Sequence, residues 1–397
     1  MQRALVGMGW VGFATAALLA CGGDASTDGT RGRGNAQTLA ARSGGGIGGT
    51  MQGAPSGGAS MWGEPIQPTR GGTGSMKPVQ TMDPMKCTTV TLNASRITPN
   101  VMLVVDGSSS MVDDPDTGMP AYYPPTQMTT RRWDAVRTAL VDPMMGVVPQ
   151  LQGLVKFGLA VFGTGAIFGG GGMCPLPLGV TAPALNNFPA VMGGLGAAPP
   201  GTFTPTGLAL NAIVDMLPDG RSLDPDKIVE PQIIILATDG NPNDCMDAMP
   251  NFQPSIEAAN KAAAKNIKMF VISVGTDTSM MHLQQMANIG AGMPMDMMPG
   301  AKVFYPENTA ELSATLSELI GKELSCEVKL EGKGVIEGRE CEGKVSIDGK
   351  ELECNGADGW RLNDPLHIEV LGTACETFKK SAQSMLLANF PCEIIVG

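Results

Sequence analysis

The sequence predicts an α/β fold with a doubly wound, mostly parallel sheet, followed by a small disulfide-rich β appendage at the C-terminus. Two strongly apolar runs, 101–105 and 233–237, each lead to an aspartate, and helical segments alternate with such runs through the middle of the chain. Apolar strands that alternate with helices are typical of a parallel sheet covered on both faces. Residues 326–397 instead show short alternating runs and five of the nine cysteines, which is typical of hairpins held by disulfides.

The elements of the middle region follow in order. Apolar runs predict strands at 101–106, 156–163, 231–238 and 269–275. Helical periods, such as the shared face of Trp133, Val136 and Leu140, predict helices at 131–151, 204–217, 254–267, 282–290 and 307–324. Ligands of such sheets bind beyond the carboxyl ends of the strands. We therefore expect Asp106 and Asp239, which follow the two most apolar strands, to share one edge.

The N-terminus predicts export. An apolar run from Ala4 to Ala20 has the length and flanks of a signal peptide. The small residue before Cys21 resembles a bacterial lipobox, so residues 1–20 are predicted to be a lipoprotein signal peptide and Cys21 to be lipidated. Several acyl chains would anchor the protein stably to a membrane. An ordinary signal peptide with an incidental cysteine is the alternative.

Residues 21–86 are rich in Gly, Ser and Pro and contain little periodic apolar sequence, which predicts a disordered tether that cannot bury a core. The chain carries a net charge of −11 and only two histidines, and its acidic excess lies after residue 86. An acidic body argues against nucleic acid as a partner. Together these features predict a bacterial envelope protein at the outer membrane or cell surface, held to the membrane through its lipid.

A set of oxygen-bearing residues predicts a metal site. Asp106, Ser108 and Ser110 form D-x-S-x-S after the first strand, Thr204 precedes a helix, and Asp239 ends a later strand. Carboxylate and hydroxyl oxygens suit Mg²⁺, with Mn²⁺ or Ca²⁺ possible, better than soft metals. Thr206 is the competing threonine. A Ser/Asp-rich turn that caps a helix is the alternative explanation.

These five positions, in this order over residues 98–324, resemble the metal-ion-dependent adhesion site (MIDAS) of the von Willebrand factor A family. Ser109 stands where the family commonly has Gly. The resemblance implies a von Willebrand factor A (VWA) domain over residues 87–325, whereas the short alternating runs and the cysteines predict a small Cys-rich β domain over 326–397. It also implies that the five residues hold a divalent cation, whose open position an acidic side chain of a protein ligand completes.

The cysteines other than Cys21 are even in number, which in an exported chain predicts disulfides. The predicted pairs are Cys87–Cys326, Cys174–Cys245, Cys341–Cys354 and Cys375–Cys392. Other connectivities stay open, in particular two separate pairings for Cys174 and Cys245.

No catalytic or cofactor-binding residue is predicted, and we expect no enzyme. His282 and His367 fall in different predicted domains, and the sequence has no G-x-S-x-G motif and no P-loop. The predicted function is divalent-cation-dependent binding of a protein ligand, in adhesion or assembly. A structural envelope protein with a stabilising metal and an accessory subunit of a larger complex are the alternatives.

Overall fold

The structure is a computed structural model that describes residues 87–113, 118–123, 130–163, 177–196, 201, 203–221, 229–244, 247–275 and 278–397. The predicted signal peptide and tether, Cys21 and the Cys174–Cys245 pair lie outside the described residues. Within these ranges, no helix combines the length and the apolar character needed to cross a membrane.

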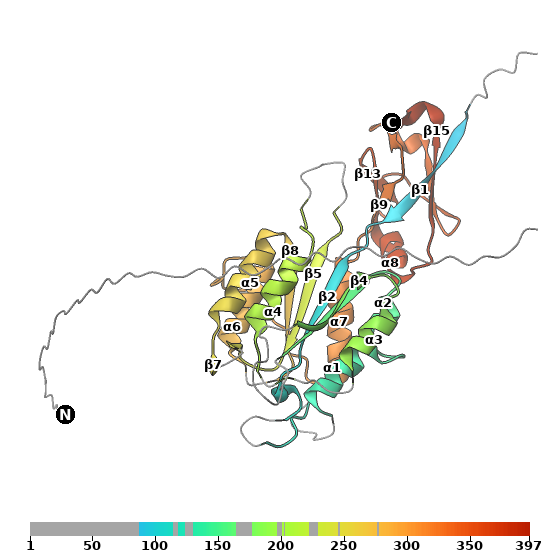
Figure 1. The fold of residues 1–397 in the computed structure, drawn as a ribbon. Helices are drawn as coiled ribbons and strands as arrows, with labels where there is room; N and C mark the ends of the chain where they lie inside the picture. The colour runs from blue at the N-terminus through green and yellow to red at the C-terminus, as the bar shows by residue number, and fades with distance from the viewer. Residues whose placement is uncertain are drawn as a thin grey trace, which may run out of the picture. The chain divides into compact units, whose positions relative to one another are not determined.

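A five-stranded sheet forms the centre of the α/β domain (Figure 1), in the order β4-β3-β2-β5-β8. Four of its strands are parallel and β4 is antiparallel. Its strands are β2 (Asn100–Asp106), β3 (Lys156–Phe162), β4 (Pro177–Ala184), β5 (Gln232–Thr238) and β8 (Ile267–Ser273). Every residue of β2 and β5 is buried, as expected for the central strands of a sheet covered on both sides.

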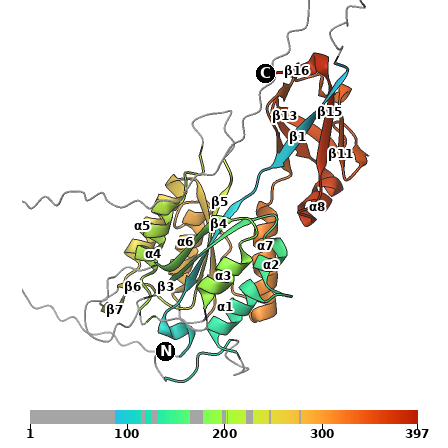
Figure 2. The same ribbon diagram turned by 45° about the vertical axis from the view of Figure 1, so that its right-hand side comes forward.

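Helices cover both faces of this sheet (Figures 1 and 2). Successive side chains of a strand point to opposite faces, so Leu103 and Met102 belong to different cores. The first core is closed by α1 (Arg132–Val141), α2 (Val147–Leu151), α3 (Phe188–Leu195) and α7 (Thr309–Glu323). The second is closed by α4 (Thr206–Met216), α5 (Gln253–Ala264) and α6 (Met280–Gly290). The predicted α/β class is confirmed.

A second, seven-stranded sheet forms the β domain, in the order β12-β11-β15-β1-β9-β14-β13, and all of its pairings are antiparallel. Its strands are β1 (Thr89–Arg96), β9 (Glu327–Leu330), β11 (Lys344–Ile347), β12 (Lys350–Leu352), β13 (Trp360–Asp364), β14 (His367–Val370) and β15 (Leu386–Pro391). Helix α8 (Gly372–Lys380) contributes Phe378 to the same core. The short pairs β6 (Asn243–Asp244) with β7 (Asp247–Pro250) and β10 (Gly334–Val335) with β16 (Ile395–Val396) complete the strands.

Strand β1 corrects the predicted domain boundary. The sequence places the start of the VWA domain at residue 87, but residues 89–96 pair with β15 on one side and β9 on the other. The α/β domain is thus inserted between β1 and β9 of one β domain. The sequence concealed this because β1 is only partly buried and its partners lie more than two hundred residues further along the chain.

The disulfides follow this topology. Cys87 is bonded to Cys392 and Cys326 to Cys375, so the predicted pairs Cys87–Cys326 and Cys375–Cys392 are wrong. The structure contains the Cys341–Cys354 bridge. Because β1 runs antiparallel to β15, Thr89 faces Pro391, which brings Cys87 beside Cys392 and leaves Cys326, next to β9, free to bond to α8.

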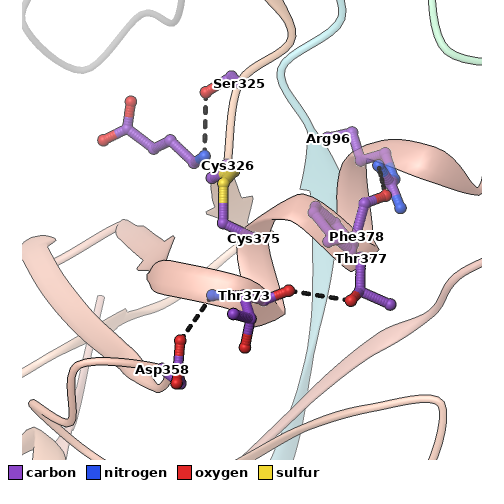
Figure 3. The surroundings of a disulfide bond; sticks show 9 residues. Arg96, Ser325, Cys326, Asp358, Thr373, Cys375, Thr377 and Phe378 are labelled. Carbon is purple, nitrogen blue, oxygen red and sulfur yellow. Dashed lines mark hydrogen bonds between the residues drawn. A yellow bond between two sulfur atoms is a disulfide. The ribbon is translucent and has the colours of Figure 1, made fainter. Parts of the chain in front are cut away.

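Arg96 ties the end of β1 to α8 beside the Cys326–Cys375 bridge (Figure 3). Its guanidinium lies 3.4 Å from the centre of the Phe378 ring and donates to the carbonyls of Phe378 and Ser381 at 3.0 and 2.9 Å. Burial lowers the pKa of Arg96 to about 10, so it stays charged at neutral pH. Cation–π contact and two hydrogen bonds thus fix α8 on the sheet.

A chain that begins at residue 97 should therefore lose the β domain. Deleting β1 leaves β15 and β9 unpaired at the middle of the sheet and removes the Cys87–Cys392 bridge, which alone is worth about 2–5 kcal/mol. We expect rapid proteolysis within residues 326–397, measured by mass spectrometry of timed digests. A chain that begins at Cys87 is the control, and equal protection of the two chains would contradict the role given to β1.

Candidate metal centre

The site is built at the carboxyl edge of the central sheet, where β2 and β5 end side by side. Val105 pairs with Ala237, so Asp106 and Thr238 are neighbours across the two strands. Oδ1 of Asp106 accepts from the backbone N–H of Ser108 at 2.9 Å, and Oδ2 accepts from the Thr238 hydroxyl at 2.6 Å. Asp106 is fully buried, and both of its oxygens have protein partners.

The two serines connect Asp106 to Asp239. The hydroxyls of Ser108 and Ser110 lie 2.9 Å apart, and Ser110 Oγ donates to Oδ1 of Asp239, also at 2.9 Å. Residues 109–111 form a short 3₁₀ turn that directly follows Ser108. Four of the five predicted residues are therefore joined by direct hydrogen bonds.

Thr204 reaches the same space from the loop before α4. Its backbone N–H donates to the side chain of Asn243 at 2.7 Å, and the N–H of Asn243 donates to its carbonyl at 3.0 Å. A Cβ placed on Gly240 would lie 3.7 Å from Ser110 Oγ and 3.9 Å from Thr204 Oγ1, so these two hydroxyls flank one small space. Thr206 directs its hydroxyl to the Thr204 carbonyl instead, which favours Thr204 over Thr206.

Glycines allow the site loops to meet. The N–H of Gly107 donates to the carbonyl of Phe162 at 2.6 Å, and the N–H of Gly201 donates to the carbonyl of Gly107 at 3.1 Å. A Cβ on Gly201 would lie 2.5 Å from that carbonyl oxygen, and one on Gly163 would lie 3.0 Å from it. Both positions lie in contact with the D-x-S-x-S loop, so a side chain at either would push the Thr204 loop away.

The structure adds a residue that the sequence analysis missed. Arg132, the first residue of α1, donates from Nη1 to Oδ2 of Asp239 at 2.9 Å, and both side chains are almost completely buried. A Cβ on Gly275 would lie 3.1 Å from Arg132 Cζ, so that glycine leaves room for the guanidinium. The sequence signal was only an arginine before a helix, and nothing local pairs it with a residue 107 positions away. Asn243 was missed for the same reason.

The electrostatics of the two acids differ. Burial, and then the negative charge of Asp239, raise the pKa of Asp106 to about 7, against the opposing effect of the hydrogen bonds from Thr238 and Ser108. The partners of Asp106 are neutral, whereas Asp239 has the cationic Arg132. The site therefore combines one acid that exchanges its proton near neutral pH with one that has a permanent counter-ion.

The donor set fits a hard divalent cation. Three hydroxyls and two carboxylates converge, whereas the described residues contain no group of three or more His, Cys, Asp or Glu side chains that could hold a metal. Hydroxyl and carboxylate oxygens are ligands of Mg²⁺, Mn²⁺ and Ca²⁺. The three hydroxyls and the two carboxylates could therefore hold such an ion, either directly or through water.

Residues 195–316, which hold Thr204 and Asp239, match the family model of the von Willebrand factor type A domain. The chain contains a VWA domain. The D-x-S-x-S segment lies before the matched residues, but the same sheet carries it as the central strand. The comparison with curated proteins gave no match.

Several solved structures are similar to this chain at low identity. The pilus adhesin SpaC from Lactobacillus rhamnosus GG is 13% identical, with a TM-score of 0.40 over 78% of this chain and 41% of that one. Proximal thread matrix protein 1 of the mussel byssus is 20% identical, with a TM-score of 0.35 over 60% and 50%. The manganese-loaded TRAP protein of Plasmodium vivax is 15% identical, with a TM-score of 0.36 over 71% and 95%. The chain thus spans half or less of the first two proteins, and functional conclusions for this VWA domain rest on its own residues.

Metal binding to the VWA domain should weaken as pH falls through 7. A proton competes with the cation for Asp106, whose raised pKa lies at about 7. We expect affinity for Mn²⁺ to fall about tenfold between pH 8 and pH 6, with proton release on binding at pH 6 and little at pH 8. Calorimetry in buffers of different ionisation enthalpy measures both quantities, and a pH-independent affinity would contradict this account of Asp106.

The raised pKa of Asp106 also determines whether the free energy of unfolding rises or falls with pH when no metal is added. The native state holds the proton of Asp106 up to about pH 7, whereas the unfolded chain releases it near pH 4. The contribution of Asp106 to stability is therefore complete below pH 4 and is lost as pH rises through 7. Urea unfolding in the presence of a chelator at pH 5 and pH 8 measures this pH dependence of stability. The variant Asp106→Asn should lose it.

Substituting Gly201→Ala should disrupt the site through the backbone alone. The new Cβ meets the Gly107 carbonyl at 2.5 Å, so the Thr204 loop must shift, at a cost of about 1–3 kcal/mol. We expect a lower melting temperature and weaker Mn²⁺ binding. Gly193→Ala in α3, where the Cβ meets nothing within 4 Å, is the matched control: it should leave Mn²⁺ affinity unchanged and should raise the melting temperature slightly, because Ala favours a helix more than Gly does. Unchanged Mn²⁺ affinity in Gly201→Ala would refute the close-approach argument.

Proposed function

We propose that the VWA domain binds a protein ligand through a divalent cation, most simply Mg²⁺. In this proposal Ser108, Ser110 and Thr204 supply neutral oxygen ligands. Asp106 and Asp239 contribute their negative charge through water. The observation that carries the proposal is the hydrogen-bonded chain Asp106–Ser108–Ser110–Asp239, with Thr204 across the space above Gly240.

The ligand class follows from the charge on these groups. Neutral hydroxyl ligands leave most of the cation's charge uncompensated, and Mg²⁺ prefers six ligands. A carboxylate from a partner protein can take an outer position and complete the shell. The activity proposed is therefore binding, in adhesion or assembly, without a catalytic step.

The setting of this binding rests on the sequence. We propose that Cys21 carries a lipid, that residues 21–86 form the tether, and that the protein resides in a bacterial envelope, at the outer membrane or cell surface. The acidic net charge of −11 opposes approach of an acidic partner. A bound cation would reverse that repulsion locally, because screening weakens the more distant charges beyond about 8 Å.

The contacts disfavour a metal that serves only stability. Protein donors already engage all four oxygens of Asp106 and Asp239, one of them through the Arg132 ion pair. These contacts occupy every carboxylate oxygen with a protein donor, so a bound cation would add stability to the native state but is not the sole partner of either acid. We therefore prefer ligand binding to the structural role, and treat the accessory-subunit role as one form of ligand binding.

Calorimetric titration of Mg²⁺ and Mn²⁺ into the full chain tests the proposal. We expect one saturable site, abolished in the double variant Asp106→Asn, Asp239→Asn, which keeps side-chain volume while removing both charges. The matched control is Asp134→Asn, Asp215→Asn, two positions on the exposed sides of α1 and α4, and it should bind as the wild type does. A folded wild type that binds neither ion would overturn the proposal.

A further inference from the structure

We infer that Arg132 is a built-in counter-cation that couples the metal to the carboxylate ligand: it weakens binding of the cation alone and strengthens binding of cation and carboxylate together. This inference rests on the proposed metal-dependent function and adds to it a condition under which the site binds its cation tightly. Its basis is the buried ion pair from Nη1 of Arg132 to Oδ2 of Asp239 at 2.9 Å.

The position of the guanidinium is fixed on several sides. Arg132 begins α1, and its backbone N–H donates to the Ala121 carbonyl at 2.9 Å. Its side chain passes close to Gly275, where a Cβ would lie 3.1 Å from Cζ of Arg132. Nη1 also lies 3.5 Å from the carbonyl of Ser110, so the cation stands directly behind a proposed ligand residue. These contacts place the guanidinium beside Asp239 on a side chain that is almost completely buried.

Counting the buried charges gives the consequence. Asp106 and Asp239, when ionised, and Arg132 sum to −1, so a bound divalent ion brings the site to +1. Without Arg132 the same groups would sum to −2 and reach neutrality with the ion. Repulsion between the guanidinium and the metal is strong at this depth, because water screens it little.

A loaded site with a net charge of +1 attracts an anion. Arg132 therefore lowers affinity for the ion alone and raises affinity of the loaded site for a carboxylate. By thermodynamic linkage, the carboxylate must then raise metal affinity by the same factor. The domain would hold its cation weakly until an acidic ligand arrives, and firmly afterwards.

The test titrates Mn²⁺ into the full chain by calorimetry, in 100 mM sodium acetate and in sodium chloride of equal ionic strength, with acetamide as the neutral control. Acetate is the carboxylate probe. Wild type, Arg132→Gln and Arg132→Lys are compared. Arg131→Gln, which removes the same charge from an exposed neighbour paired with Asp113 at 4.0 Å, is the matched control.

We expect Arg132→Gln to bind Mn²⁺ about tenfold more tightly than wild type in chloride, and to gain less from acetate than wild type does. Arg132→Lys and Arg131→Gln should behave as wild type. Equal or weaker Mn²⁺ affinity in a folded Arg132→Gln, or an equal gain from acetate, would overturn the inference while leaving the metal site standing.

The wild-type protein alone also tests the inference, without any variant. Mn²⁺ affinity must rise in acetate relative to acetamide, and its failure to rise would overturn the inference even if Arg132→Gln did not fold. Absence of Mn²⁺ binding in all proteins would overturn the proposed function as well. Binding by Arg132→Gln alone would support the inference in its strongest form.

Discussion

Two carboxylates buried side by side are the constraint around which this domain is arranged. Asp106 and Asp239 end neighbouring strands and are fully buried, and unpaired charge at such depth costs several kcal/mol or more. Each of the four carboxylate oxygens accepts a hydrogen bond from a protein donor: a backbone N–H, two hydroxyls and one guanidinium. These donors come from three separate segments, the D-x-S-x-S loop, β5 and α1, so the segments at this edge must converge closely. Gly201 and Gly275 are where that convergence leaves no space for a side chain.

The two acids are treated unequally, and the difference gives the site its chemistry. Asp106 has neutral partners and a raised pKa, so its charge depends on pH and on what binds nearby. Asp239 instead has a cationic partner, Arg132, whose Nη1 lies 2.9 Å from Oδ2. A pair of equal acids would either share one proton or demand a cation. When Asp106 is ionised, the two acids and Arg132 together carry one negative charge in excess, which attracts a divalent ion.

The sequence predicted what is local and missed what is distant. The alternation of apolar strands and helices, the edge shared by Asp106 and Asp239, and the D-x-S-x-S turn all follow from short-range patterns. Arg132 and Asn243 were missed because their roles depend on contacts with Asp239 and Thr204 that only the fold creates. The disulfide errors have the same origin: Cys87 and Cys392 lie 305 residues apart, and only the antiparallel pairing of β1 with β15 brings them together. Parity and spacing of cysteines cannot detect a strand that joins a sheet from the other end of the chain.

That long-range pairing also determines how the binding site is connected to the rest of the protein. The α/β domain leaves the β domain after β1 and returns to it before β9, and these two strands are adjacent in one sheet. Tension applied at residue 87 therefore meets β1, which is paired on both sides, and the Cys87–Cys392 bridge before it reaches β2. A strand sheared between two neighbours resists by loading many hydrogen bonds at once, whereas a terminal strand at a sheet edge loads few. With β1 inside the sheet and the Cys87–Cys392 bridge at its start, the preceding chain joins the β domain at a strand that is paired on both sides, and the α/β domain that holds Asp106 and Asp239 joins the same sheet through two adjacent strands.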